Sequence, residues 1–173
     1  MSVLPTSPRL RYRVLTEGSL DAFHELVIDP HIKRYLMDGE TFDRDWCRDA
    51  IAHSDAIFRD RGVGLWLVYE DGAEAASAEP IGFCGFFVFA ELGPEPQLLY
   101  ALREPLTGRG YATEMARAMI AYAREHSDLD PIVAGVDEPN TASLRVLEKV
   151  GFVPTGALPG RFGQTLMFEH RGV

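Results

Sequence analysis

The sequence predicts an α+β fold with a strand, a helix and a second strand at its centre, and three patterns lead to this prediction. Apolar residues alternate with arginines over residues 10–14, which is typical of a strand with one buried face. Apolar residues from Met115 to Tyr122 recur at the spacing of an amphipathic helix that runs to about His126. Ile132 to Val136 form a short continuous apolar run, which favours a central buried strand.

The other elements follow from the same rules in chain order. Ser19 is a suitable N-cap for a helix that ends before Pro30, and a second short helix follows it. A third helix spans Asp43 to about Arg59, where apolar residues keep helical spacing and Gly62 is a good stop signal. The remaining predicted elements are strands at Val63 to Tyr69, Ile81 to Phe89 and Gln97 to Arg103, a helix from Thr141 to Val150, and a closing hairpin of Phe152 to Leu158 with Gln164 to Phe168.

Length and composition favour one folded domain over residues 1–173. A chain of 173 residues is long enough to bury a core without disulfides or metals, and 46% hydrophobic with 25% charged residues is ordinary for a globular protein. No repeat is visible, and the polar segment Asp71 to Pro80 is short enough to connect two adjacent strands.

Charge and cysteine content exclude several classes of protein. The net charge of -9 would repel a nucleic-acid backbone, whereas it would modestly favour a cationic partner such as an amine. Cys47 and Cys84 have no metal-type spacing, so we expect no metal site and a buried, reduced Cys84. No apolar run has the length of a membrane span or a signal peptide, so we expect a cytoplasmic protein with no membrane partner.

A glycine-containing turn precedes the predicted helix of Met115. Residues Thr107 to Ala112 read Thr-Gly-Arg-Gly-Tyr-Ala, so several backbone N–H groups converge at a helix N-terminus, where a pyrophosphate would bind. An ordinary strand-to-helix turn is the competing interpretation. A P-loop is excluded because no Gly-Lys-Ser/Thr follows, and Thr113 stands where a dinucleotide fingerprint needs its third glycine.

A second motif, Asn140 to Phe152, makes the interpretation specific. Together with Gly108 to Glu114 it resembles the paired cofactor-binding motifs of GNAT N-acetyltransferases, and it is especially similar to the branch that acetylates ribosomal-protein N-termini. Weaker similarity begins at Arg9, so the resemblance covers nearly the whole chain. It implies a mixed, mostly antiparallel sheet with helices on both faces and a V-shaped opening between the two central strands.

The resemblance also implies the cofactor site. Acetyl-coenzyme A would lay its pantetheine arm along the Gln97 to Arg103 strand and its pyrophosphate on the glycine turn. Asn140 would contact the arm, and the competing interpretation is that it only caps a helix. Arg145 would contact a phosphate, and the competing interpretation is that it only lies on a solvated helix face. The implied contacts are Tyr100, Ala101, Leu102, Arg103, Thr107, Gly108, Arg109, Gly110, Tyr111, Ala112, Thr113, Asn140, Ser143 and Arg145.

The sequence departs from the family pattern at two positions that concern the catalytic groups. Leu147 stands where many members have a Tyr that acts as the general acid. The resemblance to the ribosomal-protein branch, in which a Ser three residues after the motif Asn takes this role, implies Ser143 instead, with capping or packing as its alternative. Gln97, which cannot act as a base, stands where the related branch often has Glu. Glu95 is the nearest carboxylate and is the candidate base, acting directly or through a water, and Glu91 is a poorer candidate. The backbone N–H of about Leu102 is the candidate oxyanion donor.

We therefore expect an enzyme that transfers an acetyl group from acetyl-coenzyme A to a primary amine in a ternary complex. The acceptor is a protein N-terminus or a small-molecule amine, bound by the variable segments Phe23 to Trp46 and Gly156 to Phe162. A non-catalytic acyl-coenzyme A sensor and a plain structural domain are the alternatives. The choice between monomer and homodimer stays open.

Overall fold

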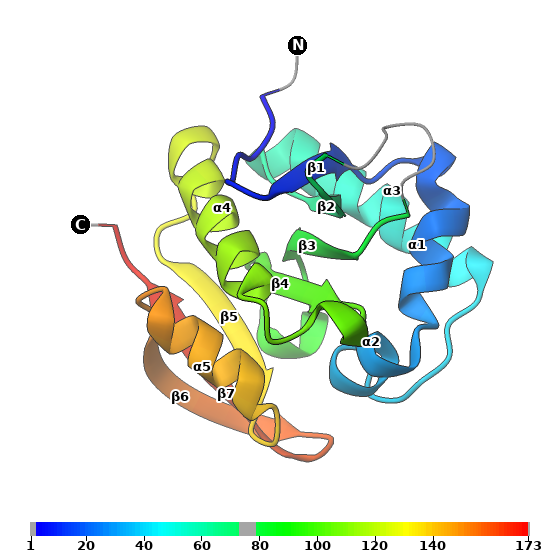
Figure 1. Ribbon diagram of the computed structural model, residues 1–173. Coiled ribbons are helices and arrows are strands. Elements are labelled where there is room, and N and C mark those ends of the chain that lie inside the picture. Colours follow the sequence, from blue (N-terminus) through cyan, green and yellow to red (C-terminus); the bar gives the residue numbers. More distant parts are fainter. Residues whose placement is uncertain (1–2, 73–78, 173) are drawn as a thin grey trace.

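One seven-stranded sheet forms the centre of the molecule. A computed structural model describes residues 3–72 and 79–172 (Figure 1). The strand order is β1-β2-β3-β4-β5-β7-β6, and all neighbouring strands are antiparallel except β4 and β5, which are parallel. The strands are β1 (Leu10–Val14), β2 (Leu65–Glu70), β3 (Gly82–Phe87), β4 (Gln97–Leu102), β5 (Ile132–Asp137), β6 (Val153–Gly160) and β7 (Gly163–His170).

Helices cover both faces of this sheet. In Figure 1, α4 and α5 lie on one side, and α1 and α3 lie on the other. Three short 3-10 helices complete the fold. The helices are α1 (Leu20–Val27), α2 (Pro30–Tyr35), α3 (Arg44–Arg61), α4 (Tyr111–His126) and α5 (Thr141–Lys149), with η1 (Glu17–Ser19), η2 (Ala90–Leu92) and η3 (Glu104–Leu106).

Burial on both faces explains why the central strands read as continuous apolar runs. Leu65 and Leu67 of β2 pack in the core beneath α1 to α3, whereas Trp66 and Val68, which point the other way, pack in the core beneath α4. Trp66 is fully buried and makes an edge-on contact with Tyr122 of α4 at a centroid distance of 4.9 Å. The sheet is thus the partition between two apolar cores.

The sheet opens between its two parallel strands. Within the described chain, β4 and β5 pair at one position, Gln97 with Val133, and then diverge toward their carboxyl ends. Val136, which lies beyond this pairing in the divergent part of β5, is only half-buried, although the sequence predicts a central buried strand. The predicted V-shaped opening is therefore confirmed. The turn at Gly108 follows the end of β4, and the motif that begins at Asn140 follows the end of β5.

The predicted elements agree with the structure apart from details at their ends. The helix predicted after Ser19 begins at Leu20, but the hydroxyl of Ser19 accepts from the N–H of Thr16 at 3.4 Å in η1 instead of capping α1. Gly62 ends α3 in the left-handed conformation, as expected. Cys84 is fully buried, and burial raises the pKa of its thiol. None of the helices in the described part of the chain is long and apolar enough to cross a membrane.

Candidate acetyl-coenzyme A site

The edge of β4 that faces the opening carries unpaired backbone groups. The N–H of Arg103 donates to the carbonyl of Ile81 at 3.0 Å, so Arg103 and every second residue before it direct their backbone toward β3. Tyr100 and Leu102 consequently direct their N–H and C=O groups toward β5, where the strands have already separated. Of the four β4 contacts that the resemblance implies, these two offer backbone hydrogen bonds to a ligand, and Ala101 and Arg103 do not.

The turn that is predicted to bind an anion lies at the start of α4. Gly108 and Gly110 adopt positive φ angles of 74° and 81°, a conformation that glycine adopts without strain. Gly110 is the N-cap of α4, and within the described chain no side chain caps this helix. Residues 107–110 are all exposed, so the backbone immediately before α4 is accessible to solvent.

Tyr111 differs from the other residues of this turn because its side chain is engaged by the protein. It is buried, its hydroxyl donates to Oε1 of Glu70 at 2.6 Å, and its ring lies beneath the guanidinium of Arg9. Ala112 and Thr113 are half-buried in the first turn of α4. Tyr111 therefore fixes the turn, and its backbone is the part that is available to a phosphate.

The start of α5 lies across the opening from Tyr100. Oδ1 of Asn140 accepts from the N–H of Ser143 at 3.2 Å, so Asn140 caps α5, as the competing interpretation expected. Capping uses only this oxygen, which leaves the amide N–H donors of Asn140 for a ligand. The hydroxyl of Tyr100 donates to the carbonyl of Ser143 at 3.2 Å, and burial raises the pKa of Tyr100 to about 12. A protonated phenol thus connects β4 to α5.

Two predicted positions of α5 have different surroundings. Leu147 is fully buried in the core beneath α4 and α5, so this position contributes packing. Arg145 is exposed on the outer face of the helix, where its guanidinium can reach solvent or a phosphate. The substitution of the family tyrosine by leucine therefore removes a hydroxyl and retains an apolar contact.

Glu95, the first candidate for the base, does not lie free in the opening, and Glu91, the poorer candidate, is exposed in η2. Oε2 of Glu95 contacts Nη2 of Arg61 at 3.0 Å, and Arg61 also contacts Asp128 at 3.1 Å. Gln97 is 3% exposed, and its Oε1 is a buried atom without a hydrogen-bond partner in the structure. The ion pair holds Glu95 at the closed end of the opening, just before β4 begins.

The two segments expected to bind the acceptor meet on the α1 and α2 side of the sheet. Oε1 of Glu40 pairs with Nη2 of Arg161 at 2.6 Å, which joins the chain after α2 to the β6–β7 turn. Burial raises the pKa of Asp38 nearby, and the negative charges of Asp137 and Glu91 add to the shift. The sequence pattern did not identify this group of carboxylates, because Asp38, Glu91 and Asp137 come from segments far apart in the chain.

This geometry agrees with comparisons to known proteins. Residues 9–153 match the model of a family described as the acetyltransferase (GNAT) domain. The chain belongs to the GNAT acetyltransferase family. It is 24% identical to an uncharacterised N-acetyltransferase, p20, of Bacillus licheniformis over 150 residues, which cover 87% of this chain and 82% of that protein.

Solved structures of GNAT proteins share the fold. A putative GNAT-family acetyltransferase from Bordetella pertussis superposes with a TM-score of 0.81 at 19% identity, covering 96% of this chain and 98% of that one. RimL, a ribosomal L7/L12 α-N-protein acetyltransferase solved with coenzyme A, superposes with a TM-score of 0.77 at 17% identity, covering 97% of both chains. The chain is accordingly a GNAT N-acetyltransferase, whose acetyl donor is acetyl-coenzyme A.

The described residues fit this donor in three respects. The start of α4 has no side-chain cap in the place that a pyrophosphate would take, β4 offers free backbone for amides, and a Cβ placed on Gly108 would meet no protein atom within 4 Å. Within the described residues no group of His, Cys, Asp or Glu could hold a metal ion. The contacts of Arg9 and Glu114 with the turn were missed from sequence, since two residues so distant in the chain give no local signal.

Proposed function

We propose that this enzyme transfers acetyl from acetyl-coenzyme A to a primary amine by direct attack within a ternary complex. The observation that carries the proposal is the open edge of β4, where Tyr100 and Leu102 direct unpaired backbone groups into the opening. This edge leads directly to the uncapped start of α4. A long ligand with amides at one end and a pyrophosphate at the other matches that order of groups.

In this proposal the motif residues divide the binding of acetyl-coenzyme A among them. Backbone groups of Tyr100 and Leu102 pair with the pantetheine amides, and the turn Thr107 to Thr113 binds the pyrophosphate. The amide N–H groups of Asn140 donate to the arm while its oxygen continues to cap α5. Arg145, exposed on α5, provides a positive charge for a phosphate. The thioester supplies the activated acetyl group.

The chemistry then requires three functions from the protein. The N–H of Leu102 stabilises negative charge on the acetyl oxygen as the amine attacks. Ser143 donates a proton to the departing thiolate, a task that is modest because thiols have a pKa near 8.5. Glu95 accepts the proton of the amine, directly or through a water, and it must first separate from Arg61.

The acceptor enters from the α1 and α2 side in this proposal. The ion pair of Glu40 with Arg161 brings together the two segments predicted to bind it. The carboxylates of Asp38, Glu91 and Asp137 near this contact favour an amine that carries positive charge. A protein N-terminus and a small-molecule amine both meet this requirement, and an acceptor screen distinguishes them.

A non-catalytic sensor of acyl-coenzyme A is the second candidate. Leu147 is buried and has no hydroxyl, Gln97 cannot act as a base, and Glu95 is engaged by Arg61. Tight binding of acetyl-coenzyme A without acetyl transfer to any of a broad set of amines and N-terminal peptides would favour this candidate.

Calorimetric titration with acetyl-coenzyme A tests the proposed site. Gly110→Asp should weaken binding at least tenfold, because its carboxylate would lie where the pyrophosphate binds. Gly110→Ala is the matched control, since it introduces the same strain at positive φ without the charge. If both variants bind equally well, the turn is not the anion site. If the unmodified protein does not bind, the proposed function is wrong.

A further inference from the structure

Arg9 makes an unusually complete set of contacts with the first turn of α4. Its backbone N–H donates to Oε1 of Glu114 at 2.8 Å, and its Nε donates to Oε2 at 2.7 Å. Its Nη2 also lies 2.7 Å from Oε2. Both oxygens of the Glu114 carboxylate are thus bound by a single residue that lies 105 positions earlier in the chain.

The same guanidinium also contacts the proposed pyrophosphate turn. Nη1 of Arg9 donates to the carbonyl of Arg109 at 3.1 Å, between the two glycines. The guanidinium carbon lies 4.5 Å from the centre of the Tyr111 ring, and Tyr111 is itself anchored to Glu70 of β2. Arg9 therefore connects the turn, the helix and the edge of the sheet.

The burial of Glu114 distinguishes this contact from an ordinary surface ion pair. Its side chain is 11% exposed, whereas that of Arg9 is 49% exposed. Burial alone would raise the pKa of Glu114, but the hydrogen bonds from Arg9, with a further one from the Ser7 side chain, outweigh it and lower the pKa. A largely buried carboxylate without a partner is costly, so the position of Glu114 depends on Arg9.

Tyr111 anchors the helix side of the turn, but the described residues give the part before it, residues 107–110, only local contacts besides that of Arg9. Residues 107–110 are exposed, and Gly108 and Gly110 can adopt many backbone conformations. The contacts of Thr107 with the carbonyl of Glu104 are local to the segment. If the turn adopts the binding conformation for only part of the time, affinity falls in proportion to that fraction.

We propose that Arg9 is a positioning residue for acetyl-coenzyme A. It acts through the Arg109 carbonyl and Glu114, and it holds the backbone N–H groups of the turn in the conformation that binds the pyrophosphate. This inference rests on the proposed function, because it assumes that the turn is the anion site. Arg9 contacts no reacting atom in the proposal, so its loss affects binding and leaves the chemical step intact.

Titration calorimetry and steady-state kinetics test the inference together. Arg9→Ala should raise the Kd and the KM for acetyl-coenzyme A by about tenfold, while kcat at saturation stays within about twofold. Arg9→Lys keeps a positive charge but cannot span Glu114 and the Arg109 carbonyl together, so its Kd should rise by about threefold. Arg59→Ala removes an exposed ion pair with Asp55 on α3 and should change neither constant.

Hydrogen exchange of the free protein adds a measurement that does not depend on activity. Amides of residues 108–114 should exchange faster in Arg9→Ala than in the unmodified protein, and those of β2 should not. Unchanged Kd and exchange in Arg9→Ala would overturn this inference alone. Failure of the unmodified protein to bind would overturn the proposed function as well. If Arg9→Ala does not fold, the Kd of Arg9→Lys decides, and a value equal to that of the unmodified protein overturns the inference.

Discussion

At the scale of single residues, several candidates have a structural role that does not exclude a functional one. Asn140 caps α5 with its oxygen and retains N–H donors, and Tyr111 anchors the turn while its backbone stays available. Ser143 is similar, because its backbone N–H and carbonyl are both hydrogen-bonded, to Asn140 and Tyr100, while its hydroxyl is a separate group. Substitution of the side chain therefore tests chemistry without removing these backbone contacts.

Ser143→Ala should lower kcat by about a hundredfold if the hydroxyl protonates the thiolate. The melting temperature should stay unchanged, because the backbone bonds of residue 143 remain. Thr141→Ala, an exposed change in the same turn, is the control and should retain full activity. A fall in kcat of less than twofold in Ser143→Ala would show that the thiolate leaves without this acid.

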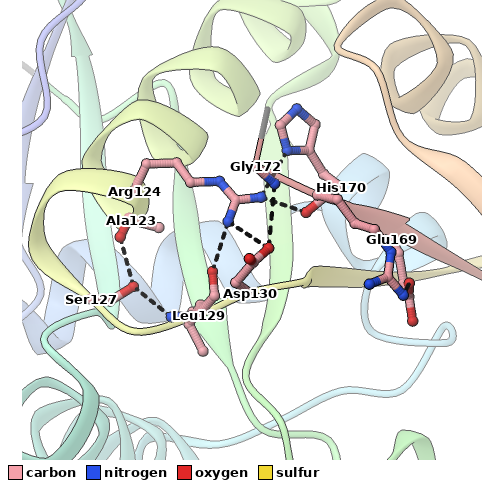
Figure 2. Close-up of polar contacts among 9 residues, drawn as sticks. Ala123, Arg124, Ser127, Leu129, Asp130, Glu169, His170 and Gly172 are labelled. Carbon is pink, nitrogen blue, oxygen red and sulfur yellow. Dashed lines mark hydrogen bonds and ion pairs between the residues drawn. The ribbon is translucent and has the colours of Figure 1, made fainter.

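At the scale of elements, the end of α4 is fastened to the end of β7. Figure 2 shows the guanidinium of Arg124 bound by Asp130, by the carbonyl of Leu129 and by His170. Nη2 of Arg124 lies 2.6 Å from the carbonyl of His170 and 3.2 Å from its Nδ1. This network holds the strand that flanks β5 and so supports the side of the opening opposite β4.

Stability should depend on the protonation of His170. Burial and the charge of Arg124 lower the pKa of His170 below its ordinary 6.5, so the unfolded chain binds the proton more readily than the folded one. Stability should therefore be complete above pH 6.5 and should fall as the pH drops through that value. Between pH 7.5 and 5.5, the melting temperature of His170→Asn should fall by about 2 °C less than that of the unmodified protein.

The control for this prediction is His53→Asn, which removes an exposed histidine of α3 outside the Arg124 network. The melting temperature of this variant should follow that of the unmodified protein at each pH. Equal pH dependence in all three proteins would mean that His170 does not contribute to acid sensitivity.

At the scale of the whole molecule, the opening divides a sheet that is continuous at only one end. On one side lie β1 to β4, and on the other lie β5, β7 and β6, joined by the pairing of Gln97 with Val133 and by the packing of α4 with α5. A ligand that bonds to β4 in the opening would bridge both halves. Binding should therefore stabilise the molecule as a unit.

Coenzyme A at about a hundred times its Kd should stabilise the folded state by about 2.7 kcal/mol. For a chain of this length this corresponds to a rise in melting temperature of about 5–10 °C, measured by scanning calorimetry. The amides of Tyr100 and Leu102 should become protected from hydrogen exchange in the same sample, whereas those of Ala101 and Arg103 are already paired with β3. Protection confined to other strands would contradict the proposed binding mode.

Periodicity predicted the order and type of the elements, because helical and strand spacings are local properties of the chain. The alternation at Leu10 to Val14 and the helical spacing from Met115 onward are both confirmed. The motif at Gly108 predicted an open helix start, since the need for positive φ limits which residues can occupy a turn. The functions of the predicted site residues stay predictions.

What the sequence determined by itself is therefore the fold class, the family and the two motifs that flank the opening. Only the tertiary structure decided that Glu95 pairs with Arg61, that Glu40 meets Arg161, and that Arg9 binds Glu114. The physical reason is that each of these contacts joins segments far apart in the chain. Side-chain pairing across a fold depends on how strands and helices pack, and no local spacing encodes it.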